Sequence, residues 1–298
     1  ITKWGTDAQK EKWLPRLATG ELIGAYCLTE PNAGSDAAAV ATSAVKDGDD
    51  WIIDGTKIFV TNGAWAGLCL VYARTNPDAS NAKGMSAFLV PTDLEGVTIG
   101  KKEKKTGIRG SSTTEILFEK VRVPADALLG EVDKGFMIAM DTLDGGRIGI
   151  ASQAVGIGQA CLDAAIKYAG EREQFGKPIG AFQAIQFKIA DISTRLEAAR
   201  LLVLKAAKLR DQGKRCSLEA ARAKLAASLM ANHAADECLQ IHGGAGYTDD
   251  FHVERLFRDA RITEIYEGAT DIQRIVISRN ILKGQLYVPI MGASIENV

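Results

Sequence analysis

A long apolar repeat between residues 182 and 206 constrains the fold of this chain more than any other feature of its sequence. Its apolar residues recur at alternating intervals of three and four: Phe182, Ile185, Ile189, Ile192, Leu196, Ala199, Val203 and Ala206. This period matches one face of an α-helix that packs along its whole length against other helices. Gly213 follows and supplies the backbone freedom with which helices commonly end. The repeat therefore predicts a long bundle helix that ends near Asp211.

Two further helices are predicted after this one. Ser217 is expected to cap a helix that runs toward Gln240, where the GGAG sequence at residues 243–246 breaks it. The TDIQ sequence at residues 270–273 is predicted to be a capping box that opens a last helix. The apolar side of that helix is predicted to consist of Ile272, Ile275, Val276 and Leu282. With the helical texture that begins after Pro124, these segments predict a bundle of four long helices.

Residues 26 to 128 have a different texture, with short β-branched and aromatic runs separated by turn signals. The clearest runs are WIIDG, TKIFVTNG, LCLVYART, MSAFLVPTD and TEILFEKVRVP. Strands separated by such short turns predict an antiparallel barrel or sandwich. Helices do not alternate with these runs, which argues against a parallel nucleotide-binding sheet. The predicted fold class is therefore α+β, an antiparallel β-barrel or sandwich followed by a four-helix bundle.

Composition limits the classes of partner and compartment. The chain has 298 residues, 46% of them apolar and 24% charged, which is typical of a soluble globular protein of one large or two ordinary domains. Its formal net charge of −1 gives no general reason to expect nucleic acid or an anionic membrane as a partner. No apolar run approaches the ~20 residues of a membrane span. Five scattered cysteines without a C-x-x-C pair indicate free thiols in a reducing compartment.

Several common catalytic motifs are missing or misleading. The GIGQAC stretch at residues 156–161 begins like a dinucleotide-binding loop, but it lies in a helical pattern and ends in Cys161, so we expect close helix packing there. A Walker loop and a G-x-S-x-G sequence are absent. His233, His242 and His252 do not have the spacing of a helical metal site, so no metal is expected.

Seven segments, taken in order, resemble the acyl-CoA dehydrogenase family. YCLTEPNAGSD is similar to the family's Y-x-L-T-E-P-x-x-G-S-D signature and IFVTNG to its W-I-T-N-G strand. The other five are GIRGSSTTEILFEKVRVP, LDGGRIGIASQAVGIGQ, EREQFGKPIGAFQAIQFKIADI, QIHGGAGY and RDARITEIYEGATDIQR. The resemblance covers essentially the whole chain and is closest to short-chain, butyryl-CoA-type members.

This resemblance implies a domain order. The family has an N-terminal helical domain, a middle β-domain and a C-terminal four-helix bundle, and most of the first is expected to be missing here. The implied boundaries are residues 1–25 for the end of the helical domain, 26–128 for the β-domain, 129–284 for the bundle and 285–298 for a tail. The resemblance further implies a homotetramer built as a dimer of dimers. It implies the mitochondrial matrix for a eukaryotic protein and the cytoplasm for a bacterial one.

The resemblance also implies FAD, bound between the β-domain and the bundle and completed by a neighbouring subunit. By similarity, the cofactor-binding residues of the β-domain are Tyr26, Leu28, Thr29, Gly34, Ser35, Phe59, Val60 and Thr61. Those of the C-terminal half are Arg172, Phe175, Gln183, Gln240, Gly243, Gly244, Thr270 and Asp271. Arginine suits a diphosphate because its planar donors reach two oxygens together, and glycine allows close approach of the backbone.

The chain departs from the family pattern at two of these positions. Phe59 stands where the family usually has tryptophan, so the ring that packs on the flavin is smaller but still aromatic. Ala269 stands where the family usually has threonine, so a hydroxyl expected near the cofactor is absent. Thr270 or Asp271 is expected to replace it.

The implied reaction converts an acyl-CoA thioester to trans-2-enoyl-CoA. Glu267 matches the family's catalytic base, which removes the α-proton while the β-hydrogen leaves as hydride to flavin N5. Some members carry the base at the position of Gly146, where no carboxylate is available, and Glu264 is expected to form an ion pair instead. The implied substrate-binding residues are Ser35, Asp144, Arg147 and Gly268, with Arg147 near the CoA end and Gly268 leaving room for the thioester.

Three functions stay open at this point. The first is a dehydrogenase that passes electrons to an electron-transferring flavoprotein. The second is an acyl-CoA oxidase that returns electrons directly to oxygen. The third is a non-catalytic acyl-CoA-binding subunit of the same fold, against which the presence of Glu267 argues.

Overall fold

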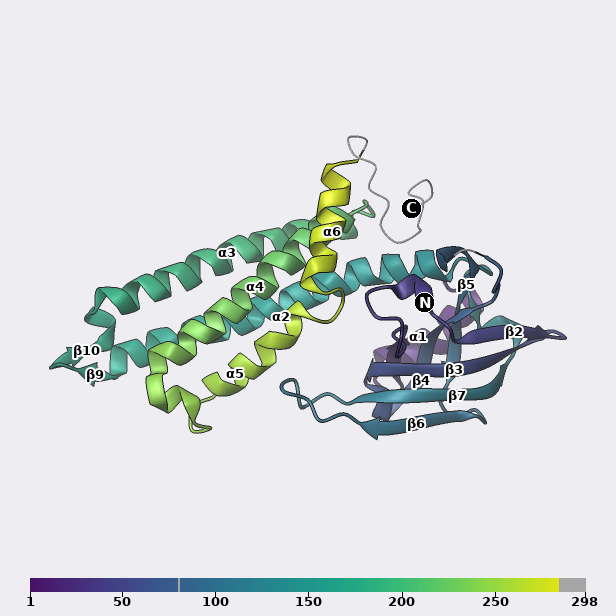
Figure 1. Cartoon of the computed structure of the whole chain (residues 1–298), viewed down its shortest axis with the longest axis horizontal. Coiled ribbons are helices and arrows are strands. Elements are labelled where there is room, and N and C mark those ends of the chain that lie inside the picture. Colours follow the sequence, from purple (N-terminus) through teal and green to yellow (C-terminus); the bar gives the residue numbers. More distant parts are fainter. Residues whose placement is uncertain (80, 284–298) are drawn as a thin grey trace. The chain divides into compact units, whose positions relative to one another are not determined.

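The computed structural model describes residues 1–79 and 81–283, which form two compact units (Figure 1). The first unit contains residues 1–105 and 109–141, and the second contains residues 106–108 and the described chain from 142 on. The predicted tail at residues 285–298 lies outside the described residues. The predicted boundaries at residues 25, 128 and 284 stay predictions.

The first unit contains one mixed sheet of eight strands. The strands are β1 (Ile23–Cys27), β2 (Ser43–Asp47), β3 (Asp50–Thr61), β4 (Ala66–Arg74), β5 (Met85–Pro91), β6 (Val97–Lys102), β7 (Thr113–Val123) and β8 (Leu128–Leu129). Their order is β6-β7-β3-β2-β4-β5-β8, and β1 pairs with β4 outside this path. The β1–β4 and β2–β4 pairs are parallel and the others are antiparallel. The predicted β-domain is confirmed, and its sheet is not a closed barrel, because the ends of this order, β6 and β8, do not pair within the described chain.

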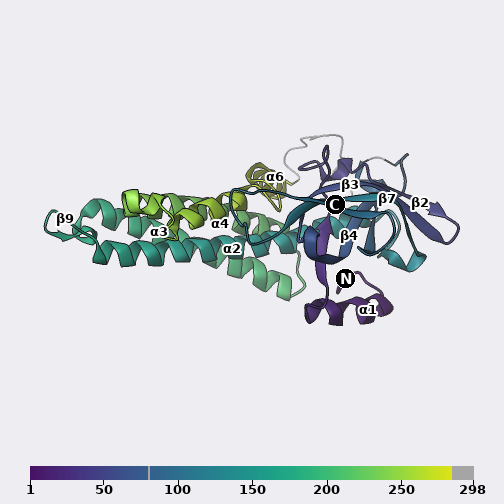
Figure 2. The same cartoon turned by 90° about the horizontal axis from the view of Figure 1, so that it is seen from below.

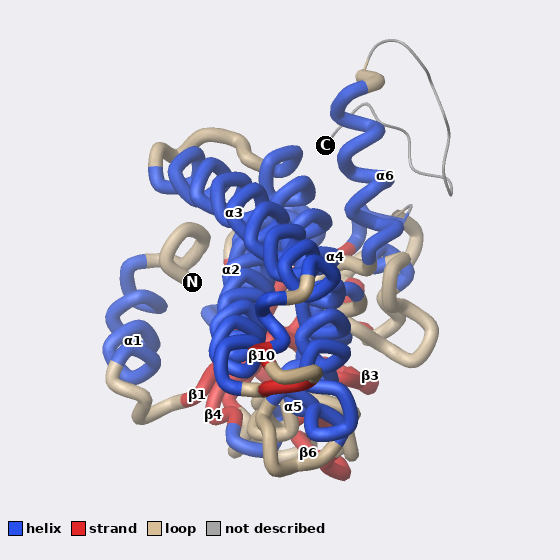
Figure 3. The backbone as a smooth tube through the Cα atoms, turned by 90° about the vertical axis from the view of Figure 1, so that its left-hand side faces the viewer, coloured by secondary structure: helices blue, strands red, loops and turns tan. Residues whose placement is uncertain are grey.

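The hydrophobic core of this unit is formed mainly by side chains of the strands. β5 is buried on both faces except at its end, which explains why its sequence is a continuous apolar run. Trp51 of β3 and Phe88 of β5 meet edge to face at 5.5 Å between ring centroids. Helix α1 (Asp7–Ala18) lies at the surface of this unit on the side of β4 (Figures 2 and 3). The Gln9 amide attaches it by donating to the carbonyls of Asp126 and Leu128, at 2.8 Å each.

The second unit is helical. Its long helices are α2 (Gly135–Glu171), whose first turns belong to the first unit, α3 (Gln183–Asp211) and α4 (Ser217–His242). Figures 1 and 3 show these three side by side. Two shorter helices follow, α5 (Val253–Ala260) and α6 (Thr270–Ile281), and a hairpin of β9 (Glu173–Gln174) and β10 (Lys177–Pro178) joins α2 to α3. No helix of the described residues is long and apolar enough to cross a membrane.

The predicted apolar face of α3 is confirmed. Ile192, Leu196, Ala199, Val203 and Ala206 are buried in a core shared with α2 and α4, and the three earlier apolar residues pack against the same core. The helix ends at Asp211 and Gly213 has φ +66°, as the sequence indicated. Close packing at the GIGQAC stretch is confirmed too, since a Cβ on Gly158 of α2 would lie 2.5 Å from Met230 Sδ of α4.

The α+β fold class with a C-terminal helical domain is confirmed, although within the described residues the helices after α4 are short, with 8 residues in α5 and 12 in α6. Two local predictions were wrong. Ser217 does not cap α4, since the cap residue is Cys216 and the Ser217 hydroxyl donates to the carboxylate of Asp144. The capping box at residues 270–273 is not formed either. Ala269 is the cap residue, and the Thr270 hydroxyl donates to the Glu264 carbonyl at 3.0 Å.

Candidate functional site

Glu267 lies in a strained loop between the 3-10 helix Arg261–Glu264 and α6. Its φ is +52° and that of Gly268 is +91°, both in the left-handed region. An L-residue is strained there and stays only where its surroundings impose it, which is a frequent property of functional sites. Six other non-glycine residues of the described chain also have positive φ, so the backbone conformation supports the choice of this carboxylate but does not make it alone.

The carboxylate of Glu267 lies against Gly146 of α2. A Cβ built on Gly146 would be 2.3 Å from Glu267 Oε2, closer than real Cβ atoms come to other atoms, and 3.1 Å from its Cδ. Any side chain at residue 146 would thus require the carboxylate to move. The two positions considered for the base share one volume, and glycine at one leaves room for glutamate at the other.

The surroundings of Glu267 favour a stronger base than a solvated carboxylate. Burial raises the pKa of Glu267 above the ordinary glutamate value, while the positive charges of Arg147 and Lys224 act in the opposite direction. The net direction is upward. A carboxylate with a raised pKa holds a proton more strongly once it has accepted it, which is what proton abstraction from carbon requires.

Arg147 and Asp144 form a buried ion pair on α2, with 2.6 Å between Nη1 and Oδ1. The Nε atom of Arg147 is also buried but has no hydrogen-bond partner within residues 1–79 and 81–283. Its distance from a Cβ built on Gly268 is 3.8 Å, so the guanidinium lies beside the Glu267 loop. The contact predicted between Arg147 and the CoA end of a substrate stays a prediction.

Gly268 is held by the protein itself. A Cβ at this residue would lie 2.3 Å from Gln273 Nε2. That amide donates to the Gly268 carbonyl at 2.8 Å and to the Glu267 carbonyl at 3.4 Å. The glycine is thus required by its φ and by Gln273, whereas its predicted role beside a thioester stays a prediction. Sequence reasoning assigned Gln273 to a cap and missed its contact with this loop.

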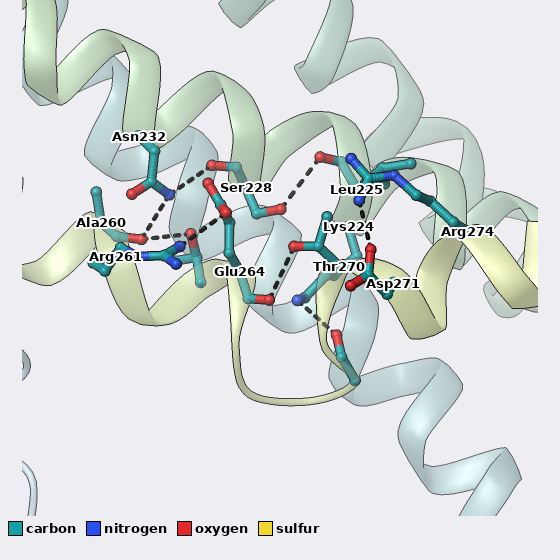
Figure 4. A network of polar contacts seen from close by, with 12 residues as sticks. Lys224, Leu225, Ser228, Asn232, Ala260, Arg261, Glu264, Thr270, Asp271 and Arg274 are labelled. Atoms are coloured by element: carbon teal, nitrogen blue, oxygen red, sulfur yellow. Dashed lines mark hydrogen bonds and ion pairs between the residues drawn. The ribbon is translucent and has the colours of Figure 1, made fainter. Parts of the chain in front are cut away.

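The polar residues that flank Glu267 in sequence are engaged within the chain (Figure 4). Glu264 pairs with Arg261 at 2.8 Å, in agreement with the ion pair expected for it. Asp271 is exposed and pairs with Arg274 at 2.7 Å, and the Thr270 hydroxyl binds the Glu264 carbonyl. The replacement of the hydroxyl absent at Ala269 by either residue stays a prediction.

In the first unit, the structure brings together the two segments predicted to border a flavin. The Ile58 N–H donates to the Thr29 carbonyl at 2.9 Å. Lys57 and Glu30, the residues adjacent to Ile58 and Thr29, are both buried and form an ion pair at 2.7 Å. The Lys57 ammonium also donates to the Leu28 carbonyl at 3.2 Å. Sequence reasoning missed this pair, although a lysine inside the apolar run of β3 was a signal for it.

Several predicted flavin-binding residues next to this ion pair in sequence are exposed. Phe59 is 65% exposed and has φ +54°, at a point where the register of β3 and β7 shifts. Thr61 and Ser35 are exposed, and Thr29 and Tyr26 are partly exposed, whereas Leu28 and Val60 are buried beneath them. A Cβ on Gly34 would meet no atom within 4 Å. An exposed aromatic ring can stack on a planar ligand, and exposed hydroxyls can bond to its polar edge, so the chemistry of these residues fits FAD.

A second group of predicted FAD residues lies at the other end of the helices in the second unit. Tyr168 of α2 stacks on His242 at the end of α4, with 4.2 Å between ring centroids. The predicted residues beside them are all exposed: Arg172, Phe175, Gln183, Gln240, Gly243 and Gly244. Phe175 has φ +54°. Arg147 and Tyr168 are separated by 21 positions of α2, or about 32 Å along the helix axis, so this group and Glu267 do not form one site within the unit.

Comparison with known proteins agrees with these features. Residues 25–121 match the family model described as Acyl-CoA dehydrogenase, middle domain, and residues 133–282 match Acyl-CoA dehydrogenase, C-terminal domain. The mitochondrial short-chain specific acyl-CoA dehydrogenase of Bos taurus is 53% identical over 283 residues, which cover 95% of this chain and 68% of the relative.

Two solved structures are similar over the same part of the chain. The butyryl-CoA dehydrogenase of Megasphaera elsdenii has a TM-score of 0.93 at 48% identity, covering 95% of this chain and 74% of its own. A chain in the structure described as the electron transferring flavoprotein of Acidaminococcus fermentans has a TM-score of 0.93 at 49% identity, with the same coverage. The chain therefore belongs to the acyl-CoA dehydrogenase family of FAD-dependent oxidoreductases.

Proposed function

We propose that this protein dehydrogenates a short-chain acyl-CoA thioester to trans-2-enoyl-CoA, with Glu267 as the base. The observation that carries the proposal is the position of the Glu267 carboxylate, which lies against Gly146 on a strained loop and has a raised pKa. The short-chain substrate class is supported by the names of the relatives from Bos taurus and Megasphaera elsdenii.

The chemistry divides between the protein and the cofactor. An α-proton of a thioester is too weakly acidic for a carboxylate in water, so the developing enolate must be stabilised. The Glu267 carboxylate accepts the proton, and the backbone N–H of Glu267 is suited to donate to the thioester carbonyl, as in an oxyanion hole. FAD, when bound, supplies the acceptor for the β-hydrogen as hydride. The positive charge of Arg147 acts to lower the pKa of Glu267 and so favours the ionised form, which is the base.

The predicted FAD residues imply more than one copy of the chain. The group at Phe59 and Thr29 is suited to the flavin ring, and the exposed group at Arg172 and Gly243 to the diphosphate and adenosine. Because the latter lies about 32 Å along α2 from the residues beside Glu267, we infer that it serves a FAD molecule other than the one next to Glu267 of its own chain. A homotetramer built as a dimer of dimers satisfies this requirement.

Electrons are proposed to pass to an electron-transferring flavoprotein. Support comes from the similarity to a chain in the Acidaminococcus fermentans flavoprotein structure. The turnover rate of butyryl-CoA is measured with an artificial electron acceptor, with an electron-transferring flavoprotein, and with oxygen as the only acceptor, which distinguishes a dehydrogenase from an oxidase. A rate with oxygen alone that equals the rates with the other two acceptors would contradict the proposal.

The base assignment is tested by Glu267→Gln, which is nearly isosteric but cannot accept the proton. The variant is expected to retain FAD and to bind butyryl-CoA, both followed in the flavin spectrum, while kcat falls by orders of magnitude. Turnover near the unmodified level would overturn the assignment. A rate series over straight and branched acyl-CoAs then defines the preferred chain length, since one methylene is worth only about 1–3 kcal/mol.

A further inference from the structure

Lys224 of α4 is fully buried within the second unit, beside the Glu267 loop. A buried ammonium is costly unless its donors are used and its charge is balanced. Its Nζ atom donates to the Gly268 carbonyl at 2.8 Å. Figure 4 shows Lys224 extending from α4 toward the loop that connects Glu264 to Thr270. A lysine is thus buried where its charge and its hydrogen bond both reach the proposed base.

The loop is held by donors from two helices. The Gly268 carbonyl accepts from Lys224 Nζ and from Gln273 Nε2, both at 2.8 Å. A carbonyl oxygen has two acceptor sites, so this one is fully used. The Glu267 carbonyl accepts from the same Gln273 amide at 3.4 Å. Two consecutive peptide carbonyls are therefore fixed by buried side chains of α4 and α6.

This loop requires such support because of its backbone conformation. Both Glu267 and Gly268 have positive φ, and the glutamate is strained there. Without the buried donors, the loop would relax and the carboxylate would leave its place against Gly146.

We propose that Lys224 is a positioning residue for the reaction: by binding the Gly268 carbonyl, it holds the Glu267 backbone so that the carboxylate and N–H of Glu267 are in place for an acyl-CoA thioester. This inference rests on the proposed role of Glu267 as the base. Lys224 is not proposed to exchange a proton with the substrate, and it acts through the loop that carries Glu267.

Electrostatics supports the same role. The charged and titratable groups around Glu267 are Arg147 from α2, Lys224 from α4, and Glu264 and Tyr266 from the adjoining segment. Burial lowers the pKa of Lys224 to about 8, with the two glutamates acting in the opposite direction. Since Lys224 and Arg147 both lower the pKa of Glu267, removing the lysine charge raises it further.

The test is Lys224→Met in the FAD-loaded protein, with butyryl-CoA and an artificial acceptor. Methionine is similar in shape and uncharged, and Gln273 still donates to the Gly268 carbonyl, so no backbone acceptor is left unpaired. We expect kcat to fall about 10- to 100-fold, because misplacing a catalytic group by about 1 Å costs up to about 100-fold in rate and Gln273 still holds part of the loop. KM should change much less, and the acid limb of the pH profile of kcat/KM should move to higher pH.

The matched control is Lys188→Met, which removes another lysine of the same unit. Lys188 of α3 pairs with Glu237 of α4, and no hydrogen bond or ion pair of the described residues joins it to the Glu267 loop. Its kcat and acid limb should be unchanged. If Lys224→Met does not retain FAD, Lys224→Gln is measured in its place with the same expectations, because its amide is too short to reach the carbonyl.

A parallel measurement of Glu267→Gln separates the two proposals. If Glu267→Gln is inactive while the Lys224 variant has an unchanged kcat and acid limb, Lys224 has no positioning role and the base assignment stands. If Glu267→Gln turns over normally, the base assignment itself fails. Loss of kcat with a shifted acid limb in the Lys224 variant, together with an inactive Glu267→Gln, supports both.

Discussion

Substituting Gly146 by alanine tests whether the volume beside α2 is reserved for the Glu267 carboxylate. The new Cβ would lie 2.3 Å from Oε2 and 3.1 Å from Cδ of Glu267. Non-bonded carbon atoms are attracted at about 3.5–4.0 Å and repel at shorter distances. The carboxylate must therefore move by about 1 Å, either by rotation of its side chain or by a shift of the loop.

The expected consequence is a loss of rate without a loss of folding. A displacement of about 1 Å of a catalytic group costs about 100-fold in rate. Replacing glycine by alanine inside a helix stabilises the helix by about 0.5–1 kcal/mol. Because the colliding atoms are the far end of a flexible side chain, we expect this gain to offset much of the local strain.

The assay compares Gly146→Ala with Gly149→Ala, three positions further along α2. A Cβ on Gly149 would meet no atom within 4 Å, so this control changes helix propensity alone. Acceptor-coupled kcat with butyryl-CoA and the midpoint of thermal unfolding are measured for both. We expect a low kcat for Gly146→Ala alone and an unfolding midpoint that does not fall in either variant. Equal kcat values in the two variants would refute the argument that this glycine makes room for the base.

Three further predictions concern Gly268, the buried Lys57 ion pair and the pKa of Glu267. Gly268→Ala should lower the free energy of unfolding by about 1–2 kcal/mol in urea titrations, because alanine is strained at left-handed φ and its Cβ meets Gln273. Lys57→Met should lower it by about 3–5 kcal/mol, because the buried Glu30 charge loses its counter-ion. Adding Glu30→Gln should restore part of this, because the amide carries no charge and its oxygen can still accept from a backbone N–H that Glu30 binds; a double variant no better than the single one would contradict the ion-pair explanation. Finally, kcat/KM should fall as the pH is lowered through the raised pKa of Glu267, since only the unprotonated carboxylate is a base; an acid limb at the ordinary glutamate value would contradict it.

The predictable parts of this protein are those that depend on local periodicity. The alternation of three and four positions between Phe182 and Ala206 is a direct record of one helix face, and α3 buries that face. The end of α3 near Gly213 was equally visible, because only glycine adopts left-handed φ without strain. The β-branched runs before residue 128 indicated strands in the same way. Their pairing, with two parallel neighbours of β4, was not visible, because register depends on strands distant in sequence.

The two capping errors have one physical cause. A hydroxyl at a helix start bonds either to its own backbone or to a group elsewhere, and sequence shows only the first choice. Ser217 binds Asp144, which is 73 positions away, and Thr270 binds the carbonyl of Glu264. The side chain of Gln273, assigned to a cap, turns instead to the Glu267 loop.

The candidate site also has parts that the sequence indicated and parts that only the tertiary structure showed. The sequence by itself determined which residue is the best candidate for the base, because a resemblance preserves the order of residues along the chain. Only the tertiary structure decided what surrounds that candidate. Gly146 and Lys224 become neighbours of the Glu267 loop through the packing of α2, α4 and α6, and steric room and electric charge act through space rather than along the chain.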